Sequence, residues 1–326
     1  MVVGAGAHGA ATAWHLARRG RSVALLERFE PGHVRGSSHG GTRIFRLAYP
    51  HAGYARMAVA ARDGWRELED DCGEVLLEVT GGIDHGDVQE VVDATTACGI
   101  PFEVLEPGAA AERWPAMRFD RRVVFQPDAG RCYADRAVAA LQRRAADHGA
   151  DVRFGCDVAA VDGLEVRTSD GTWRASEAVV VAAGAWATRF VDVPVTVTEE
   201  RVLHFPGPTD LPSFIHWAEP SHYGLVTPGE GVKVGEHHAG PPVDPDGRGF
   251  EVPDEVRARL VDYVRSWLPG LDPEPVTGTT CLYTTTPDEE FVLERRGDLV
   301  VVSCCSGHGF KFTPEIGRRA ADLALR

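Results

Sequence analysis

The chain has 326 residues, of which 44% are hydrophobic, so it is long enough to bury one large core or two smaller ones. Its formal net charge of -14 argues against a nucleic-acid or anionic-membrane partner, because such binders are basic. No apolar run approaches the roughly 20 residues that span a bilayer. The seven irregularly spaced cysteines indicate reduced thiols rather than a disulfide framework. With no export signal or peroxisomal address visible, we expect a two-domain cytoplasmic protein.

A strand, a glycine turn, a helix and a second strand are predicted over residues 1–27, with the helix over residues 10–19. In this arrangement Gly4 makes the tight turn, Gly6 lets the backbone approach a pyrophosphate, and Gly9 lets the helix pack closely on the strand. Glu27 ends the second strand, where a carboxylate can accept hydrogen bonds from ribose hydroxyls. The motif therefore predicts a dinucleotide at the helix N-terminus, and it does not distinguish NAD from FAD.

A glycine-rich polar loop follows over residues 36–46 and carries one histidine and two arginines. An arginine fork matches a carboxylate with two hydrogen bonds. On composition alone, a solvated basic loop explains this segment equally well. The candidate binding residues in it are Ser38, His39, Thr42, Arg43 and Arg46.

The middle of the chain contains a second segment with the features of a dinucleotide contact. A helix is predicted over residues 135–148, with Val138, Leu141 and Ala145 on its apolar face. After a strand over 151–154 and a hairpin around Asp170-Gly171, a buried strand runs into the small-residue turn that contains Gly184 and Trp186. Only small residues let a backbone come close to a dinucleotide. An ordinary buried strand that ends at glycine is the alternative interpretation.

The remaining segments predict a second domain that is inserted in two pieces. They are rich in prolines and in short alternating runs, as in sheets. We therefore predict an α/β fold with a Rossmann-like dinucleotide-binding domain and a sheet-rich α+β substrate domain, and we expect the site between them. The first domain is expected to comprise residues 1–78, 131–194 and 284–326, and the second residues 79–130 and 195–283.

Two segments imitate metal motifs. Asp244 and Asp246 open a spacing that resembles a calcium-binding loop, but Arg248 occupies a place where an oxygen ligand belongs. The adjacent pair His237-His238 has no third ligand at helical spacing. We predict a polar loop in the first case and no metal in either.

Lysine is rare in this chain, because only Lys233 and Lys311 among its 34 basic residues are lysines. Alternation along its strand places Lys233 opposite the valines on either side, and Lys311 is expected to open the last predicted helix, residues 314–325. Exposed positions are the ordinary interpretation of both. Cys281 is a candidate nucleophile if a positively charged setting favours its thiolate, although most cysteines only fill cores.

The C-terminal segments Cys281-Leu282-Tyr283-Thr284, Thr286-Pro287-Asp288-Glu289 and residues 306–312, Ser-Gly-His-Gly-Phe-Lys-Phe, together with the glycine motif, resemble the monomeric sarcosine oxidase family of flavoprotein amine oxidases. The resemblance covers nearly the whole chain, which is shorter than typical members. It implies that the dinucleotide is FAD, attached covalently through Cys281. It also implies that the matching lysine, Lys233, activates oxygen.

The same resemblance assigns a role to the other candidates. Arg46 and Lys311 would hold a substrate carboxylate, His39 and Arg43 would lie against the flavin, and Tyr223 and His237 would line the substrate pocket. The full set of expected cofactor-binding residues is Gly4, Gly6, Gly9, Glu27, Ser38, His39, Thr42, Arg43, Gly184, Trp186, Cys281, Tyr283, Gly307, Gly309, Phe310 and Lys311.

The sequence thus predicts an FAD-dependent amine oxidase that converts an N-methyl or cyclic secondary amino acid to an imine and reduces O2 to hydrogen peroxide. Its partners would be a carboxylate-bearing amine and O2, and the resemblance implies a monomer. Two alternatives stay open. One is a flavin dehydrogenase or biosynthetic imino-acid-forming oxidase acting on another ring amine, and the other is a flavin-binding homologue without turnover.

Overall fold

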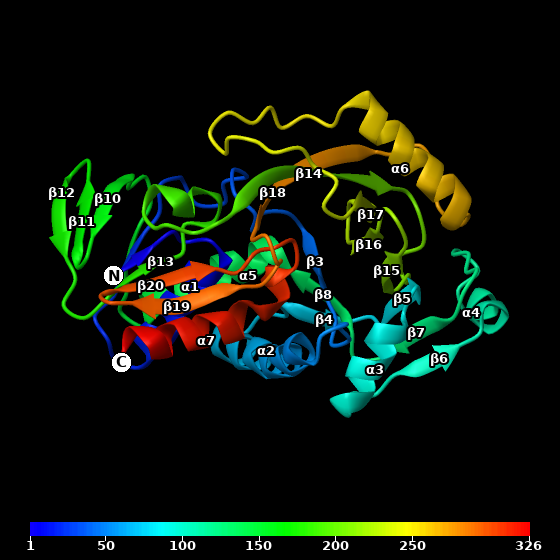
Figure 1. Cartoon of the computed structure of the whole chain (residues 1–326), viewed down its shortest axis with the longest axis horizontal. Helices are drawn as coiled ribbons and strands as arrows, with labels where there is room; N and C mark the ends of the chain where they lie inside the picture. Colours follow the sequence, from blue (N-terminus) through cyan, green and yellow to red (C-terminus); the bar gives the residue numbers. More distant parts are fainter.

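The structure, a computed structural model, describes residues 1–326 and contains two large sheets and two small ones. Figure 1 shows the six-stranded sheet toward the left and the eight-stranded sheet toward the right. In the six-stranded sheet, all neighbouring strands are parallel except β19 and β20. Its strands, in spatial order, are β19 (Val292–Arg296), β20 (Leu299–Ser303), β13 (Val179–Val181), β1 (Val2–Val3), β2 (Ala24–Leu26) and β9 (Asp151–Arg153).

Both faces of the six-stranded sheet are covered, and successive residues of β1 point to opposite faces. Val2 belongs to a core of 38 buried residues that helices build on one face. Val3 belongs to the core on the other face, with Val166 and Trp173 from a small antiparallel sheet. The helices are α1 (Ala7–Arg18), α2 (Ala52–Cys72), α5 (Ala134–Asp147) and α7 (Thr313–Ala324), and the small sheet comprises β10 (Val158–Asp162), β11 (Glu165–Thr168) and β12 (Gly171–Arg174).

The eight-stranded sheet is antiparallel except where β5 and β15 pair in parallel. One face is covered by α6 (Asp254–Trp267), whose Leu260 and Val264 are buried with Val232 of β17. Two shorter helices, α3 (Gln89–Ala97) and α4 (Pro107–Arg113), lie near its edge (Figure 1). Its strands, in spatial order, are β18 (Thr277–Thr285), β14 (Thr196–Phe205), β17 (Gly231–Glu236), β16 (His222–Thr227), β15 (Ser213–Trp217), β5 (Gly82–Gly86), β7 (Val123–Gln126) and β6 (Glu103–Leu105).

A third sheet joins the two large ones. It consists of β3 (Thr42–Phe45), β8 (Gly130–Tyr133) and β4 (Leu77–Val79). The hydroxyl oxygen of Thr42 lies 2.6 Å from that of Thr227 on β16, so β3 contacts the eight-stranded sheet directly. Two 3-10 turns, η1 (Gly184–Arg189) and η2 (Gly309–Phe312), follow strands of the six-stranded sheet.

The predicted α/β fold is confirmed, as are the N-terminal strand, turn, helix and strand and the hairpin that pairs Val166 with Trp173. Three details differ. The first helix begins at Ala7, directly after the glycine turn, because Gly6 is its N-cap. Alanines and Leu141 form the buried face of α5, while Val138 borders the cavity described below. Lys311 lies in η2, before the last helix.

The predicted domain boundaries stay a prediction, although the sheets are compatible with them. The eight-stranded sheet takes its strands from two separate stretches, 82–126 and 196–285. None of the helices combines the length and apolarity that a membrane crossing requires.

Candidate active site

A cavity of about 470 Å³ lies between the two large sheets and is lined from both sides. It begins at the glycine turn after β1, continues past the loop of residues 36–46 and ends against β16, β17 and β18. Because the carboxyl ends of parallel strands meet there, this is the edge of an α/β sheet at which ligands bind.

The glycine turn has the close backbone packing that the motif predicts. Gly4 has a positive φ of 95°, and a Cβ there would lie 2.5 Å from the carbonyl oxygen of Ala182. A Cβ on Gly9 would lie 1.9 Å from the carbonyl oxygen of Gly4, so Gly9 packs the helix on the strand and does not line the cavity. Gly6 does line it, at the N-terminus of α1. An anion is favoured at this end of the helix.

Glu27 is buried at the end of β2 and borders the cavity. Its carboxylate accepts hydrogen bonds from the backbone N–H groups of Ala5, at 2.8 Å, and Phe29, at 3.1 Å. An ionised carboxylate can accept about four hydrogen bonds, so capacity remains for two ribose hydroxyls. Gly184 and Trp186 line the same end of the cavity.

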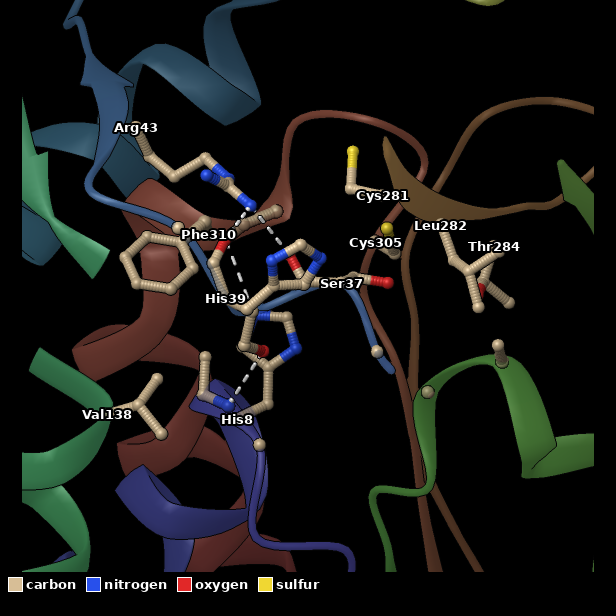
Figure 2. A pocket seen from close by; sticks show the side chains of 18 of the residues that line it. His8, Ser37, His39, Arg43, Val138, Cys281, Leu282, Thr284, Cys305 and Phe310 are labelled. Carbon is tan, nitrogen blue, oxygen red and sulfur yellow. Dashed lines mark hydrogen bonds between the residues drawn. The ribbon is translucent and has the colours of Figure 1, made fainter. Parts of the chain in front are cut away.

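The loop of residues 36–46 is organised by Arg43 (Figure 2). Its guanidinium donates to the carbonyl oxygens of Ser37, His39 and Thr42 at 2.6 to 3.0 Å. His39 borders the cavity, and its buried Nε2 has no partner. Burial, followed by the charge of Arg43, lowers the pKa of His39 to about 3. A neutral imidazole with an unpaired nitrogen fits a polar group bound in the cavity, as the flavin ring of FAD would supply.

Cys281 lies on β18 and borders the cavity, and Figure 2 shows it on the opposite side of the pocket from Val138. Burial raises the pKa of its thiol, while the charges of Arg43 and Lys233 act in the opposite direction. Positive charge is therefore present near the thiol, and in this structure burial outweighs it. Cys305 also lines the pocket.

Lys233 extends into the cavity from β17, whose Val232 and Val234 point into the core of the eight-stranded sheet. The predicted alternation is thus confirmed, and the ordinary interpretation of an exposed lysine is wrong because Lys233 is buried. Its ammonium donates to the carbonyl oxygen of Thr42. Burial, with Arg43 second, lowers the pKa of Lys233 to about 7. The side chain of Thr42 itself does not line the cavity.

Arg46 and Lys311, 265 positions apart in the chain, meet around one aromatic ring, that of Tyr49. The guanidinium carbon of Arg46 lies 4.1 Å and the Nζ of Lys311 5.3 Å from its centroid. Lys311 Nζ donates to the Tyr49 hydroxyl and to the carbonyl oxygen of His308, both at 2.7 Å. Burial, and then the charge of Arg46, holds the pKa of Lys311 well below its usual range. An incoming carboxylate raises the pKa of a neighbouring ammonium, so Arg46 and Lys311 can bind it together as two cations.

Aromatic side chains complete this end of the cavity. His237 Nδ1 lies 3.3 Å from the hydroxyl of Tyr283, and Tyr223 lies nearby on β16. Burial, followed by His238, lowers the pKa of His237 to about 3. Burial also lowers the pKa of His308 strongly. The histidines of this wall are therefore neutral near pH 7.

Of the predicted site residues, all but Gly9 and Thr42 line the cavity. The structure adds residues that sequence reasoning missed. Tyr49 and Trp217 contact Arg46, and Asp84 pairs with it from behind. The polar loop that contains Asp246 also reaches the site, because Asp246 accepts hydrogen bonds from Arg28 and Trp186. Only the position of Tyr49, three residues after Arg46, could have drawn attention in the sequence.

Comparison with known proteins gives consistent results. Residues 1–323 match the family described as "DAO: FAD dependent oxidoreductase". The chain is 30% identical to monomeric sarcosine oxidase from Bacillus sp. (strain NS-129), with 99% of this chain and 92% of that protein covered. It is also 30% identical to N-methyl-L-tryptophan oxidase from Yersinia pestis (strain Pestoides F), with 99% and 94% covered.

Solved structures of amino acid oxidases are similar to this chain over its whole length. NikD, an amino acid oxidase essential for nikkomycin biosynthesis, superimposes with a TM-score of 0.88 at 29% identity, and the match covers 100% of this chain and 93% of that one. Glycine oxidase from Geobacillus kaustophilus has a TM-score of 0.85 at 23% identity, with 100% and 94% covered, which shows a shared fold.

Proposed function

The chain belongs to the FAD dependent oxidoreductase family, and on that premise we propose that it is an amine oxidase that converts an N-methyl or cyclic secondary amino acid to an imine. The observation that carries the proposal is the meeting of Arg46 and Lys311 around Tyr49, in the same cavity that begins at the glycine turn. The names of its relatives, sarcosine oxidase and N-methyl-L-tryptophan oxidase, support this class of substrate.

The residues around the cavity fit FAD. The glycine turn and the N-terminus of α1 would hold the pyrophosphate, and Glu27 would hold the ribose. His39, with its unpaired nitrogen, and Arg43 would lie against the ring system. When bound, FAD supplies the acceptor for the two electrons that leave the amine.

Arg46 and Lys311 bind and orient the substrate through its carboxylate. Both are buried, so water competes weakly for their hydrogen bonds. The same cations disfavour an ammonium group in the cavity, and the substrate amine therefore reacts in its neutral form. His237 and His308 are neutral near pH 7, and oxidation of a neutral amine by hydride loss requires no protein base.

We further propose O2 as the electron acceptor, with Lys233 as the residue that favours it. An ammonium held in place stabilises negative charge that develops on oxygen, without any proton transfer. Lys233 is buried and fixed by its hydrogen bond to Thr42, which supports a preorganised charge.

Three finer points belong to the same proposal. Cys281 is the residue we expect to carry a covalent bond to the flavin, because it is the cavity thiol that the family resemblance marks. We also expect a monomer and a cytoplasmic location. A yellow protein that keeps its flavin after acid precipitation, and a Cys281→Ser variant that loses it, would support the covalent bond.

The proposed function is tested by a peroxide-coupled assay with a panel of secondary amino acids, including sarcosine and L-pipecolate. We expect peroxide with at least one of them, and a large loss of turnover in an Arg46→Met variant. Arg174→Met, which breaks an exposed ion pair on β12, is the control and should behave like the wild type. Turnover with an artificial acceptor but not with O2 would favour the dehydrogenase alternative. A colourless protein that takes up no FAD would contradict the proposal.

A further inference from the structure

A buried polar cluster lies directly behind Arg46, outside the cavity. Its centre is Asp84 on β5, which is 1% exposed. Asp84 Oδ1 accepts hydrogen bonds from Arg46 Nη1 at 3.1 Å and from Trp217 Nε1 at 2.9 Å, and Oδ2 accepts one from Gln126 Nε2 at 2.7 Å. Arg46 and Trp217 also line the cavity, so the cluster connects the protein interior with the substrate wall.

The arrangement of donors indicates that Asp84 is ionised. Gln126 cannot turn its amide around, because its Oε1 accepts from the backbone N–H groups of Leu47 and Ala48 at 3.0 and 2.6 Å. Every group that faces Asp84 is therefore a donor, and a proton on the carboxyl would find no acceptor. Burial raises the pKa of Asp84, and the charge of Arg46 and the three hydrogen bonds act in the opposite direction.

The hydrogen bonds of Arg46 to the protein are confined to one end of its guanidinium. Both use Nη1, which donates to Asp84 and, at 3.0 Å, to the carbonyl oxygen of Ala48. The Nε and Nη2 atoms keep their donors for a ligand. A guanidinium anchored at one end presents its other edge in a fixed direction, as two parallel hydrogen bonds to a carboxylate require.

We propose that Asp84 is a positioning residue that fixes the guanidinium of Arg46. As the counterion of Arg46, it also reduces the electrostatic attraction of Arg46 and Lys311 for the substrate carboxylate. This inference rests on the proposed function. Binding that is equally strong in the ground state and the transition state lowers KM without raising kcat. A permanent counterion reduces the part of the carboxylate binding that is equal in the ground state and the transition state. The fixed direction of Arg46, in turn, orients the bound substrate and with it the carbon–hydrogen bond that reacts.

An Asp84→Asn variant separates these effects from ordinary destabilisation. Asparagine keeps the shape and one acceptor, removes the charge, and places an amide donor against Gln126. The probe is benzoate, a carboxylate that cannot be oxidised as an amine. Without the counterion, we expect the Kd for benzoate to fall about tenfold, because one opposing charge near Arg46 and Lys311 is gone. We expect kcat for the best amine substrate to fall about tenfold as well, because Arg46 is less firmly oriented. A second variant, Asp84→Glu, keeps the charge and moves the carboxylate, so kcat should fall while the Kd stays near the wild-type value.

The matched control is Asp71→Asn. Asp71 on α2 is likewise held by an indole N–H, that of Trp14 at 2.8 Å, and by an arginine, Arg144, at 3.1 Å, but it lies away from the cavity. Benzoate binding to the flavin-loaded proteins is followed by the flavin absorbance spectrum, and turnover by peroxide. Opposite effects on affinity and kcat in Asp84→Asn, absent from Asp71→Asn, are the expected result.

The possible failures are distinguishable. If Asp84→Asn weakened benzoate binding, or changed Kd and kcat no more than Asp71→Asn does, the inference would be wrong while the proposed function stood. If the wild type bound no benzoate and oxidised no amine, the proposed function itself would fail. Arg46→Met separates the two cases further, because loss of benzoate binding in that variant shows that Arg46 binds the carboxylate, whatever the role of Asp84.

Discussion

The pH dependence of the reaction with oxygen tests the role of Lys233 most directly. Burial lowers the pKa of this lysine to about 7, so its ammonium is largely present below that pH and is lost above it. If the charge stabilises developing negative charge on oxygen, reoxidation should be fast at low pH and slow at high pH. A variant without the amine, Lys233→Met, should be slow at every pH.

The size of the effect follows from the buried position. Removal of one preorganised donor from a water-excluded site lowers a rate by about 10² to 10³-fold, and we expect a loss of this order in Lys233→Met. One pH unit above the pKa only about a tenth of the lysine is charged. The wild-type rate constant should therefore decline about tenfold per pH unit above pH 8, until it meets the rate of the variant.

The assay is stopped-flow mixing of photoreduced protein with oxygenated buffer between pH 6 and pH 9, followed by flavin absorbance. Lys311→Met is the matched control, because Lys311 is the other lysine of the chain and lines the same cavity. We expect this control to impair amine oxidation and to leave the oxygen step and its pH dependence nearly unchanged. A wild-type rate that does not vary with pH, or an unchanged rate in Lys233→Met, would refute the reasoning.

Two further predictions concern how the cofactor site is built. Asp246→Ala removes the acceptor that joins the loop before α6 to Arg28, at 2.7 Å, and to Trp186, at 3.0 Å. In a Cys281→Ser protein, we expect the added Asp246→Ala change to make FAD dissociate faster on gel filtration. Equal FAD retention with and without Asp246 would contradict a role of Asp246 in the cofactor site. Gly9→Ala places a methyl group 1.9 Å from a backbone oxygen and should abolish FAD uptake or folding, as measured by flavin content and thermal unfolding. In Gly108→Ala, where the added Cβ meets nothing within 4 Å, both measurements should stay at wild-type values.

The sequence predicted those features that depend on neighbours along the chain. The glycine turn has fixed spacings, and alternation within one strand was enough to place Lys233 opposite Val232 and Val234. Asp84 could not be found this way. It meets Trp217 only because β5 pairs in parallel with β15, some 130 residues later, and parallel pairing over such a separation leaves no local pattern.

The loop with Asp244, Asp246 and Arg248 shows a similar limit. Its composition predicts a polar loop rather than a calcium site, since an arginine occupies a ligand position. Its actual contacts could not be predicted. Arg248 is buried and donates to Thr280 at 2.8 Å, and Asp246 reaches across to the six-stranded sheet side of the cavity. The loop of residues 244–248, which belongs to the sheet-rich part of the chain, thus helps to form the expected FAD-binding end of the cavity. The spacing of its acidic residues does not reveal this contact.

The choice of lysine at two positions in an arginine-rich chain has a physical consequence. A guanidinium stays charged in any protein environment, whereas a buried ammonium loses its proton readily. Arg46 accordingly keeps a permanent charge and has a permanent counterion in Asp84. Lys311 has no acidic partner, and its hydrogen bonds go to the neutral Tyr49 hydroxyl and the carbonyl oxygen of His308. Its charge therefore responds to what enters the cavity, because an incoming carboxylate raises the pKa of a neighbouring ammonium. The carboxylate-binding pair thus combines Arg46, which is fixed in charge and direction, with Lys311, whose charge the substrate itself stabilises.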